Sequence, residues 1–331
     1  MTRVTELQTI RSLLTSVSRA RKDIDRIGND ISSGVKVREP FDSIQASSIS
    51  QYQQTLQRYE GYTTRIAAVE SYLTFQDDTL NDMNELIARM KEIATQAANE
   101  PNGSVARSQM AEEIWQIRDN VLSLANGTYQ GRYVWNGAAD STPPYTASTT
   151  LYTVPATGPA GIRYVFNASA NPGADTPRTV QLTDDLSIQT NTPGSEVFND
   201  ALFAAERLGR ALVGFRTEPA TGAPNGTGTA YTFPADLNEQ TQALQGVLDT
   251  LNTARGTILT ERTDLGGRLR RLETGRNLLE LNKGNITKAL DTLQNTDVSE
   301  AATQLTLAQN ALQASLTVTS RVIGQNILDF L

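Results

Sequence analysis

Apolar residues recur every three and four positions along residues 1–40. The members of this stripe are Ile10, Leu13, Val17, Ala20, Ile24, Ile27 and Ile31. Such alternating spacing is typical of a coiled-coil helix, and every second member here is β-branched. Gly34 and Pro40 predict the end of the helix, with Gly34 as its C-cap or turn residue.

A second stripe predicts a long helix within residues 41–127. Apolar and aromatic residues return every seven positions, at Tyr52, Tyr59, Ile66, Leu73, Leu80 and Ile87. A turn-forming stretch, Asn-Glu-Pro-Asn-Gly-Ser, follows at residues 99–104. Ser104 is the predicted N-cap of a shorter helix that carries the chain to about residue 127.

The longest stripe lies in residues 237–296. It holds nine successive heptad positions: Leu237, Leu244, Leu251, Ile258, Leu265, Leu272, Leu279, Ile286 and Leu293. A continuous helix of this span is roughly 85 Å long at 1.5 Å per residue. We expect these side chains to form a core within the chain, packed on the helix that spans residues 52–97. Gly266 and Gly267 are expected to mark close helix packing.

A final stripe occupies residues 297–331 and continues to the last residue. Thr296 or Asp297 is its expected N-cap, with Glu300 in the first turn. We expect both terminal stripes to bury their apolar surface against neighbouring subunits, because neither closes a core of its own. The predicted interface residues are Ile10, Leu13, Val17, Ile24, Ile27, Ile31, Leu305, Leu312, Leu316, Ile323, Ile327, Phe330 and Leu331.

Residues 128–236 have a different composition from the helical segments. They hold ten of the twelve prolines and twelve of the twenty aromatic residues, which favours a small packed domain over a flexible linker. Val180 and Leu182 alternate with polar residues, as do Leu186 and Ile188, which predicts a hairpin that turns at Asp184-Asp185. One helix is expected here, with Leu202, Ala205, Leu208 and Leu212 on one face.

These elements predict a mainly α fold with an inserted β-rich domain. The arms 41–127 and 237–296 are expected to form a long antiparallel coiled-coil rod, with 128–236 as an outer α+β domain between them. Residues 1–40 and 297–331 are the expected assembly helices.

The composition limits the catalytic and metal-binding groups that the chain can offer. The chain has no cysteine and no histidine, so it lacks thiol nucleophiles, disulfides and the commonest general base and metal ligand. A formal charge of −7 disfavours a nucleic-acid partner, and no stretch approaches the ~20 apolar residues of a membrane span. Asp42, Asp184-Asp185 and Glu112-Glu113 are the remaining carboxylates that could do chemistry, and we expect them to be solvated. We therefore predict no enzyme activity, cofactor or metal.

Three segments carry a resemblance to a known family. Residues 25–49 run through Ser-Ser-Gly and a Pro-Phe-Asp segment into a long helix. Residues 106–137 form a helix that is followed by an Asn-Gly-Thr-Tyr run at 126–129, and residues 296–331 form the terminal helix. Together they resemble the flagellin superfamily of bacterial flagella. Pro40-Phe41-Asp42 and the ending Leu328-Asp329-Phe330-Leu331 are similar to its hook–filament junction members.

The resemblance implies a structural role outside the cell. Such proteins are exported unfolded by the flagellar type III apparatus, without a cleaved signal peptide. Their terminal helices are disordered in the monomer and become coiled coil on assembly. The implied partners are other copies of the chain, a neighbouring hook-associated protein, flagellin, and a cytosolic export chaperone on the C-terminal helix.

Two alternatives stay open at the level of sequence. The chain could be a filament flagellin, which would polymerise alone when seeded. It could also be a secreted adhesin or tip protein that uses residues 128–236 as its binding module. The sequence does not assign a role to that outer domain.

Overall fold

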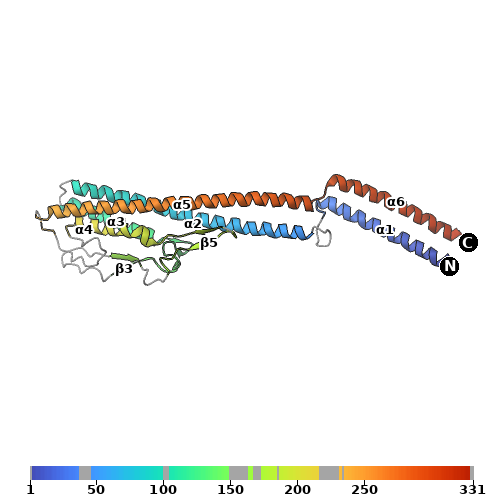
Figure 1. The fold of residues 1–331 in the computed structure, drawn as a ribbon, viewed down its shortest axis with the longest axis horizontal. Coiled ribbons are helices and arrows are strands. Elements are labelled where there is room, and N and C mark those ends of the chain that lie inside the picture. The colour runs from blue at the N-terminus through green and yellow to red at the C-terminus, as the bar shows by residue number, and fades with distance from the viewer. Residues whose placement is uncertain are drawn as a thin grey trace. The chain divides into compact units, whose positions relative to one another are not determined.

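The computed structural model describes residues 2–36, 46–99, 104–148, 163–166, 173–184, 186–215, 231–232 and 235–328. Within these residues the chain is mainly helical, which confirms the predicted fold class (Figure 1). The helices are α1 (Thr2–Ser33), α2 (Ala46–Asn99), α3 (Ser104–Ala125), α4 (Gly194–Leu212), α5 (Leu237–Gln294) and α6 (Val298–Leu328). The strands are β1 (Thr128–Tyr129), β2 (Arg132–Tyr133), β3 (Tyr145–Ser148), β4 (Arg163–Phe166), β5 (Thr179–Gln181) and β6 (Ser187–Gln189). They form three antiparallel pairs in chain order, β1–β2, β3–β4 and β5–β6.

The chain forms two compact units. The first consists of residues Met1–Gly61 and Leu278–Leu331, and the second of Tyr62–Asn277. Helices α2 and α5 contribute residues to both units, so the division falls within these helices rather than at the expected junctions near residues 40 and 297. The first unit contains the terminal helices α1 and α6, and the second contains the whole outer domain.

The core of the second unit lies along α2 and α5. Residues of the two predicted stripes are buried, namely Ile66, Leu73, Leu80, Ile87, Leu244, Leu251, Ile258, Leu265 and Leu272. Polar contacts between α5 and α2 set an antiparallel register: Arg276 bonds Glu70 at 3.0 Å, Arg262 bonds Asp77 at 2.8 Å, and Arg255 bonds Asn84 at 3.1 Å. The expected intramolecular core is confirmed for these positions.

Helices α3 and α4 pack closely beside this core through small residues and one buried charge cluster. Ala111 on α3 and Ala201, Ala204 and Ala205 on α4 are buried. Glu206 of α4 accepts from Arg118 of α3 at 3.1 Å and from Arg210, one turn along α4, at 3.2 Å. The side chains of Glu206 and Arg210 are only 6% and 4% exposed. The carboxylate therefore links the two helices where little water can screen it.

The segment that follows α3 turns the chain into the outer domain. The Asn126 side chain pairs with the backbone of Tyr145, accepting from its N–H at 3.0 Å and donating to its carbonyl at 3.1 Å. Trp135 is fully buried and packs edge-on against Phe198 of α4, with ring centroids 5.1 Å apart. Asn126 thus joins the entry loop to β3, and Trp135 joins it to α4.

The predicted hairpin is present. Strands β5 and β6 pair with Val180 opposite Ile188, and Leu182 donates to the Leu186 carbonyl at 2.8 Å. The hairpin contacts α2, because the Tyr62 hydroxyl donates to Asp184 at 2.9 Å. A Cβ at Gly275 of α5 would lie 3.1 Å from a Leu186 methyl group, so the hairpin also lies against α5.

Tyr145 makes the stability of the outer domain depend on pH in the alkaline range. Its hydroxyl lies within 2.8 Å of both the Gly194 carbonyl and Asn199 Oδ1, and burial raises the pKa of this phenol well above 10. The folded state therefore keeps its proton where the unfolded chain loses it, so this stabilisation is complete below about pH 10 and falls as pH rises further.

We expect Tyr145→Phe to lower the free energy of unfolding by about 1 kcal/mol at pH 7. The difference in stability from the parent protein should shrink above about pH 10. There the phenol ionises in the unfolded parent and stabilises its unfolded state, whereas phenylalanine cannot ionise. Urea titrations of both proteins at pH 7 and 10.5 measure this. A difference that stays constant or grows with pH would contradict the assignment.

Candidate assembly interface

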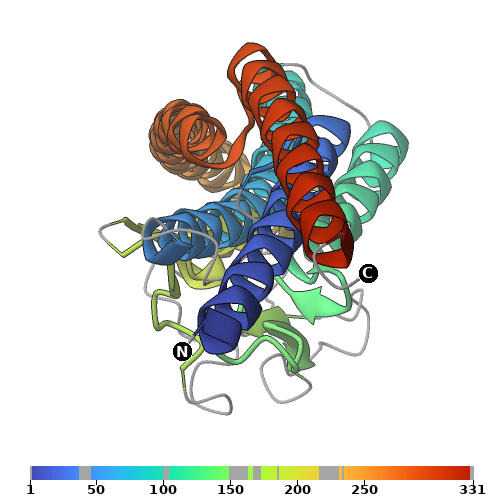
Figure 2. The same cartoon turned by 90° about the vertical axis from the view of Figure 1, so that its right-hand side faces the viewer.

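Helices α1 and α6 lie side by side and run in opposite directions (Figures 1 and 2). Two backbone hydrogen bonds join them where α1 ends and α6 is about to begin: Lys36 donates to the Gln294 carbonyl, and Thr296 donates to the Gly34 carbonyl, both at 2.8 Å. The start of α1 and the end of α6 therefore both lie at the end of the pair that is away from these hydrogen bonds (Figure 1).

Local signals in the sequence set both helix ends at this crossing. Gly34 has φ +74° and donates to the Asp30 carbonyl at 2.9 Å, so it terminates α1 in a left-handed conformation, as predicted. Asp297 accepts from the backbone N–H groups of Ser299 at 2.9 Å and Glu300 at 3.2 Å. It is the N-cap of α6, one of the two residues expected for that role.

The predicted interface residues divide into three groups. Ile27 is buried, and Leu13, Val17, Ile24, Ile31, Leu305 and Leu312 are half-buried. Leu316 is exposed to 50%. Ile10, Ile323 and Ile327 belong to the described helices, but their side chains lie outside the described residues, as do Phe330 and Leu331 altogether.

The face of α6 that meets α1 differs in one place from the predicted stripe. Its less exposed positions are Ala301, Leu305, Ala308, Leu312, Ser315 and Thr319, with spacings of four and three in strict alternation. The sequence prediction chose Leu316 because it is apolar, whereas the helix period selects Ser315. Leu316 therefore lies beside the seam with α1.

Apolar surface remains exposed around the α1–α6 pair. Besides Leu316, the exposed side chains include Leu14 at 55%, Leu307 at 63% and Val318 at 48%. Helix α6 carries only Glu300 and Arg321 as charged residues along its 31 positions. A helix that is apolar on more than one face is normally buried on more than one face. Its partner α1 covers one of them, which leaves surface for association.

The carboxylates that were considered for chemistry are bonded to other side chains, exposed, or outside the described residues. Asp184 accepts from Tyr62, Glu113 accepts from Arg89 at 2.6 Å, and Glu112 is exposed. Asp42 and Asp185 fall outside the described residues. Among those that are described, no three acidic side chains come together as metal ligands, and no helix is long and apolar enough to cross a membrane.

Family models match most of this architecture. The bacterial flagellin N-terminal helical region matches residues 4–140, and the C-terminal helical region matches residues 248–331. The chain belongs to the bacterial flagellin family. The matched ranges contain α2, α3 and α6 and most of α1 and α5, whereas the flagellin models do not reach residues 141–247, which comprise most of the outer domain and the start of α5.

Similar proteins within this family carry a more specific name. Flagellar hook-associated protein 3 of Escherichia coli is 24% identical over 310 residues, which is 91% of each chain. Among solved structures, Bacillus cereus FlgL has a TM-score of 0.54 at 19% identity, over 73% of this chain and 99% of that one. Hook-associated protein 3 of Legionella pneumophila has a TM-score of 0.57 at 16% identity, over 74% and 98%. At these identities the structures support the shared fold.

Sequence reasoning missed two features of this flagellin-family chain. Glu206 and Arg210 are spaced as an i,i+4 ion pair on a predicted helix, which signals a pair but not its burial against Arg118. Ser315 and Thr319 were overlooked because they are polar. Continuing the alternation of three- and four-residue steps from Leu305, Ala308 and Leu312 selects both.

Proposed function

We propose that this chain is the junction protein that joins the hook of a bacterial flagellum to its filament. The observation that carries the proposal is the α1–α6 pair, which closes one seam and leaves Leu14, Leu307, Leu316 and Val318 exposed. The relationship to a hook-associated protein over 91% of both chains supports this position within the flagellin family. The role is structural and requires no catalysis.

Assembly at the junction explains why α6 is so poor in charge. Neighbouring copies, a second hook-associated protein and flagellin are the partners that would cover its remaining apolar faces. Export through the flagellar type III route to the outside of the cell, with a cytosolic chaperone that shields α6 beforehand, belongs to the same proposal. That the terminal helices are disordered in the free subunit, and order on assembly, stays a prediction.

Removal of residues 298–331 tests the proposal most directly. We expect the shortened chain to keep the fold of its second unit and to lose the ability to join hook to filament, because α1 loses its partner and the association surface disappears. A strain that lacks the native gene should then release filaments and stop swimming. Filament growth at the parental level with the shortened chain would contradict the proposal.

A pair of substitutions separates the association surface from the helix itself. Leu307→Ser with Val318→Ser removes exposed apolar surface while leaving the α1 seam in place. The matched control, Gln304→Ser with Gln313→Ser, changes exposed polar residues of the same helix. We expect only the first pair to impair filament attachment, and equal swimming by both strains would count against the proposal.

Filament flagellin is the second candidate, because the family models that match are those of flagellin. Seeded polymerisation of the purified full chain separates the two. Long filaments built from this protein alone would establish the flagellin role, whereas a junction protein should not polymerise into long filaments from the seeds.

A further inference from the structure

We propose that an elongated groove along α2 binds the exposed face of α5 from a second copy of this chain, with both copies pointing in the same direction. The inference rests on the proposed self-assembling role and adds a specific contact to it. All the residues involved belong to the second compact unit.

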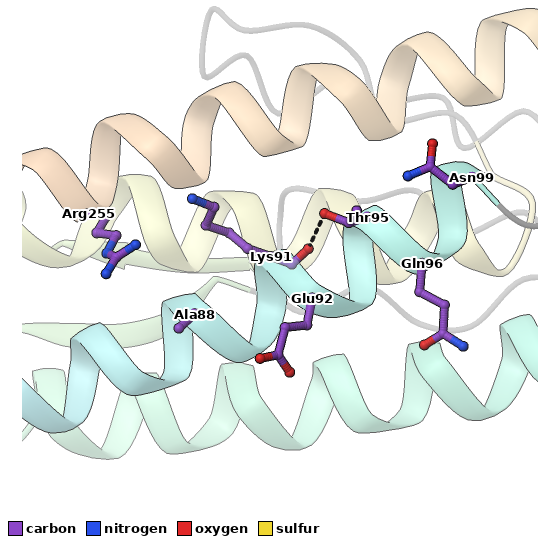
Figure 3. A pocket seen from close by; sticks show the side chains of 7 residues that line it. All are labelled: Ala88, Lys91, Glu92, Thr95, Gln96, Asn99 and Arg255. Carbon is purple, nitrogen blue, oxygen red and sulfur yellow. Dashed lines mark hydrogen bonds between the residues drawn. The ribbon is translucent and has the colours of Figure 1, made fainter.

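The groove consists of two consecutive hollows beside α2. The first, of about 310 Å³, lies between α2 and α3 and is lined by Asp82, Glu85, Leu86, Asn120, Ser123 and Leu124. The second, of about 600 Å³, is lined by Ala88, Lys91, Glu92, Thr95, Gln96, Asn99 and Arg255 (Figure 3). In Figure 3, α2 lies between α5 and α3. The labelled side chains of α2 project from this helix, and Ala88 is the smallest of them. Both hollows are open to solvent, and together they follow α2 over about 26 Å, the length of 17 helical residues.

The first hollow carries uncompensated negative charge. Asp82 and Glu85 are exposed and lie three residues apart on α2, where like charges repel. Among the described residues, the only hydrogen bond to Glu85 comes from the Asn81 amide at 3.4 Å. Glu92, in the second hollow, is already paired with Arg89. The hollow nearer Asp82 is therefore the one that a cation fits.

Helix α5 offers a complementary face on the side away from its core. Positions Gly256, Thr260, Thr263, Gly267 and Arg270 follow one another at spacings of four and three and are exposed or half-buried. Beside Arg270 lies Arg271, and no ion pair within the described part of the chain engages either guanidinium. The stripe thus has small residues at one end and two cations at the other.

The glycines of this face have no explanation inside one chain. A Cβ added at Gly256, Gly266 or Gly267 would meet nothing within 4 Å. The expectation that Gly266 and Gly267 mark close packing is therefore wrong for contacts within the chain. Glycine destabilises a helix relative to alanine, so three of them at an open face are consistent with the close approach of another chain.

The two faces match in length and order when they run antiparallel. With Arg270 and Arg271 beside Asp82 and Glu85, Gly267 falls near Ala88, and Gly256 falls near Asn99. Within one chain α5 runs antiparallel to α2. If α5 of one copy also runs antiparallel to α2 of the other copy, the two copies point in the same direction. A contact between two different surfaces of parallel copies is heterologous, and it generates rings or helices around an axis.

Single cysteines test the contact, because the chain contains none of its own. Full-length Ala88→Cys protein is mixed with full-length Gly267→Cys protein at high concentration and oxidised. We expect a disulfide-linked pair that contains one copy of each variant. The control mixes Ala88→Cys with Gln242→Cys, an exposed α5 position beyond the matched stretch. A cross-linked yield no higher than that of the control mixture would overturn the proposal.

Charge reversal tests the pairing of the two surfaces. We add Asp82→Arg and Glu85→Arg to the Ala88→Cys protein, or Arg270→Glu and Arg271→Glu to the Gly267→Cys protein. Either pair of substitutions alone should lower the cross-linked yield about tenfold, and mixing the two charge-reversed proteins should restore it. Loss without restoration would overturn the proposed register. Attachment of filaments is measured separately in cells, so a selective cross-link combined with failure at the junction would reject the proposed function and keep this contact.

Discussion

Replacing Glu206 with alanine should lower the free energy of unfolding of the second unit by about 3–5 kcal/mol, the range expected when one partner of a buried ion pair is removed. Arg118 and Arg210 would then face each other across the α3–α4 interface without the carboxylate that joins them, and Arg118 would keep its bond to the exposed Asp119, at 2.9 Å. The side chains of Arg118 and Arg210 are only 11% and 4% exposed, so full hydration of both would require the helices to separate. The cavity left by the shortened side chain adds to the loss.

Tryptophan fluorescence during urea unfolding is the appropriate measurement. The chain has two tryptophans, Trp115 on α3 and Trp135 in the outer domain, and both belong to the second unit. The signal therefore reports the unit in which the substitution lies. Glu113→Gln is the matched control, because it also removes a carboxylate of a salt bridge to arginine, but one on the surface. Its effect should be far smaller, since solvent screens exposed pairs.

A triple variant distinguishes buried charge from lost volume. Arg118→Met, Glu206→Leu and Arg210→Met together replace the cluster with apolar side chains of similar size. We expect this variant to recover most of the stability lost in Glu206→Ala, because the desolvation of all three charges is removed at once. A triple variant as unstable as the single one would show that packing, and not the loss of the Glu206 carboxylate, dominates at this site.

The helical part of the fold could be predicted because its signal is periodic and repeated. Each heptad from Leu244 to Leu272 gives the same information, and an error at one position is corrected by its neighbours. The caps at Gly34 and Asp297 were also predictable, since the geometry of each depends on a few adjacent residues. The β5–β6 hairpin follows the same logic of local alternation.

The assembly surface was predicted only in part, for a physical reason. A stripe identifies an apolar face, but α6 has apolar residues on several faces and few charges to mark its solvent side. Apolar character alone therefore could not show whether Ser315 or Leu316 meets α1. The contact between α1 and α6 also joins distant parts of the chain, such as Gly34 and Thr296, and nothing local to either helix encodes the pairing.

The outer domain was the least predictable part, because its contacts are individual rather than repeated. Asn126 pairs with the backbone of Tyr145, and Glu206 pairs with Arg118, 88 residues away. No period connects such residues. Composition indicated a packed domain through its aromatic residues, and the structure shows that Trp135 and Phe198 meet in its interior.

Gly137→Ala should destabilise the second unit by about 3 kcal/mol or more, since backbone strain and a steric clash combine at this position. Gly137 has φ +54°, in the left-handed region that costs other residues about 1–2 kcal/mol. A Cβ there would also overlap with the carbonyl oxygens of Ala174 and Gly173. Both obstacles are backbone atoms, and Gly173 is held by a hydrogen bond from Ala138 at 3.0 Å, so relief requires the loop to move.

Gly131 provides the matched control in the same entry loop. Its φ is +78°, but a Cβ there would meet nothing within 4 Å, so Gly131→Ala should cost only the conformational part. Asparagine tolerates left-handed backbone better than alanine does. Gly131→Asn should therefore unfold close to the parent, whereas Gly137→Asn should remain as unstable as Gly137→Ala, because it has the same Cβ. Urea unfolding followed by the fluorescence of nearby Trp135 measures all four variants, and equal losses at positions 131 and 137 would show that the loop yields to the clash without cost.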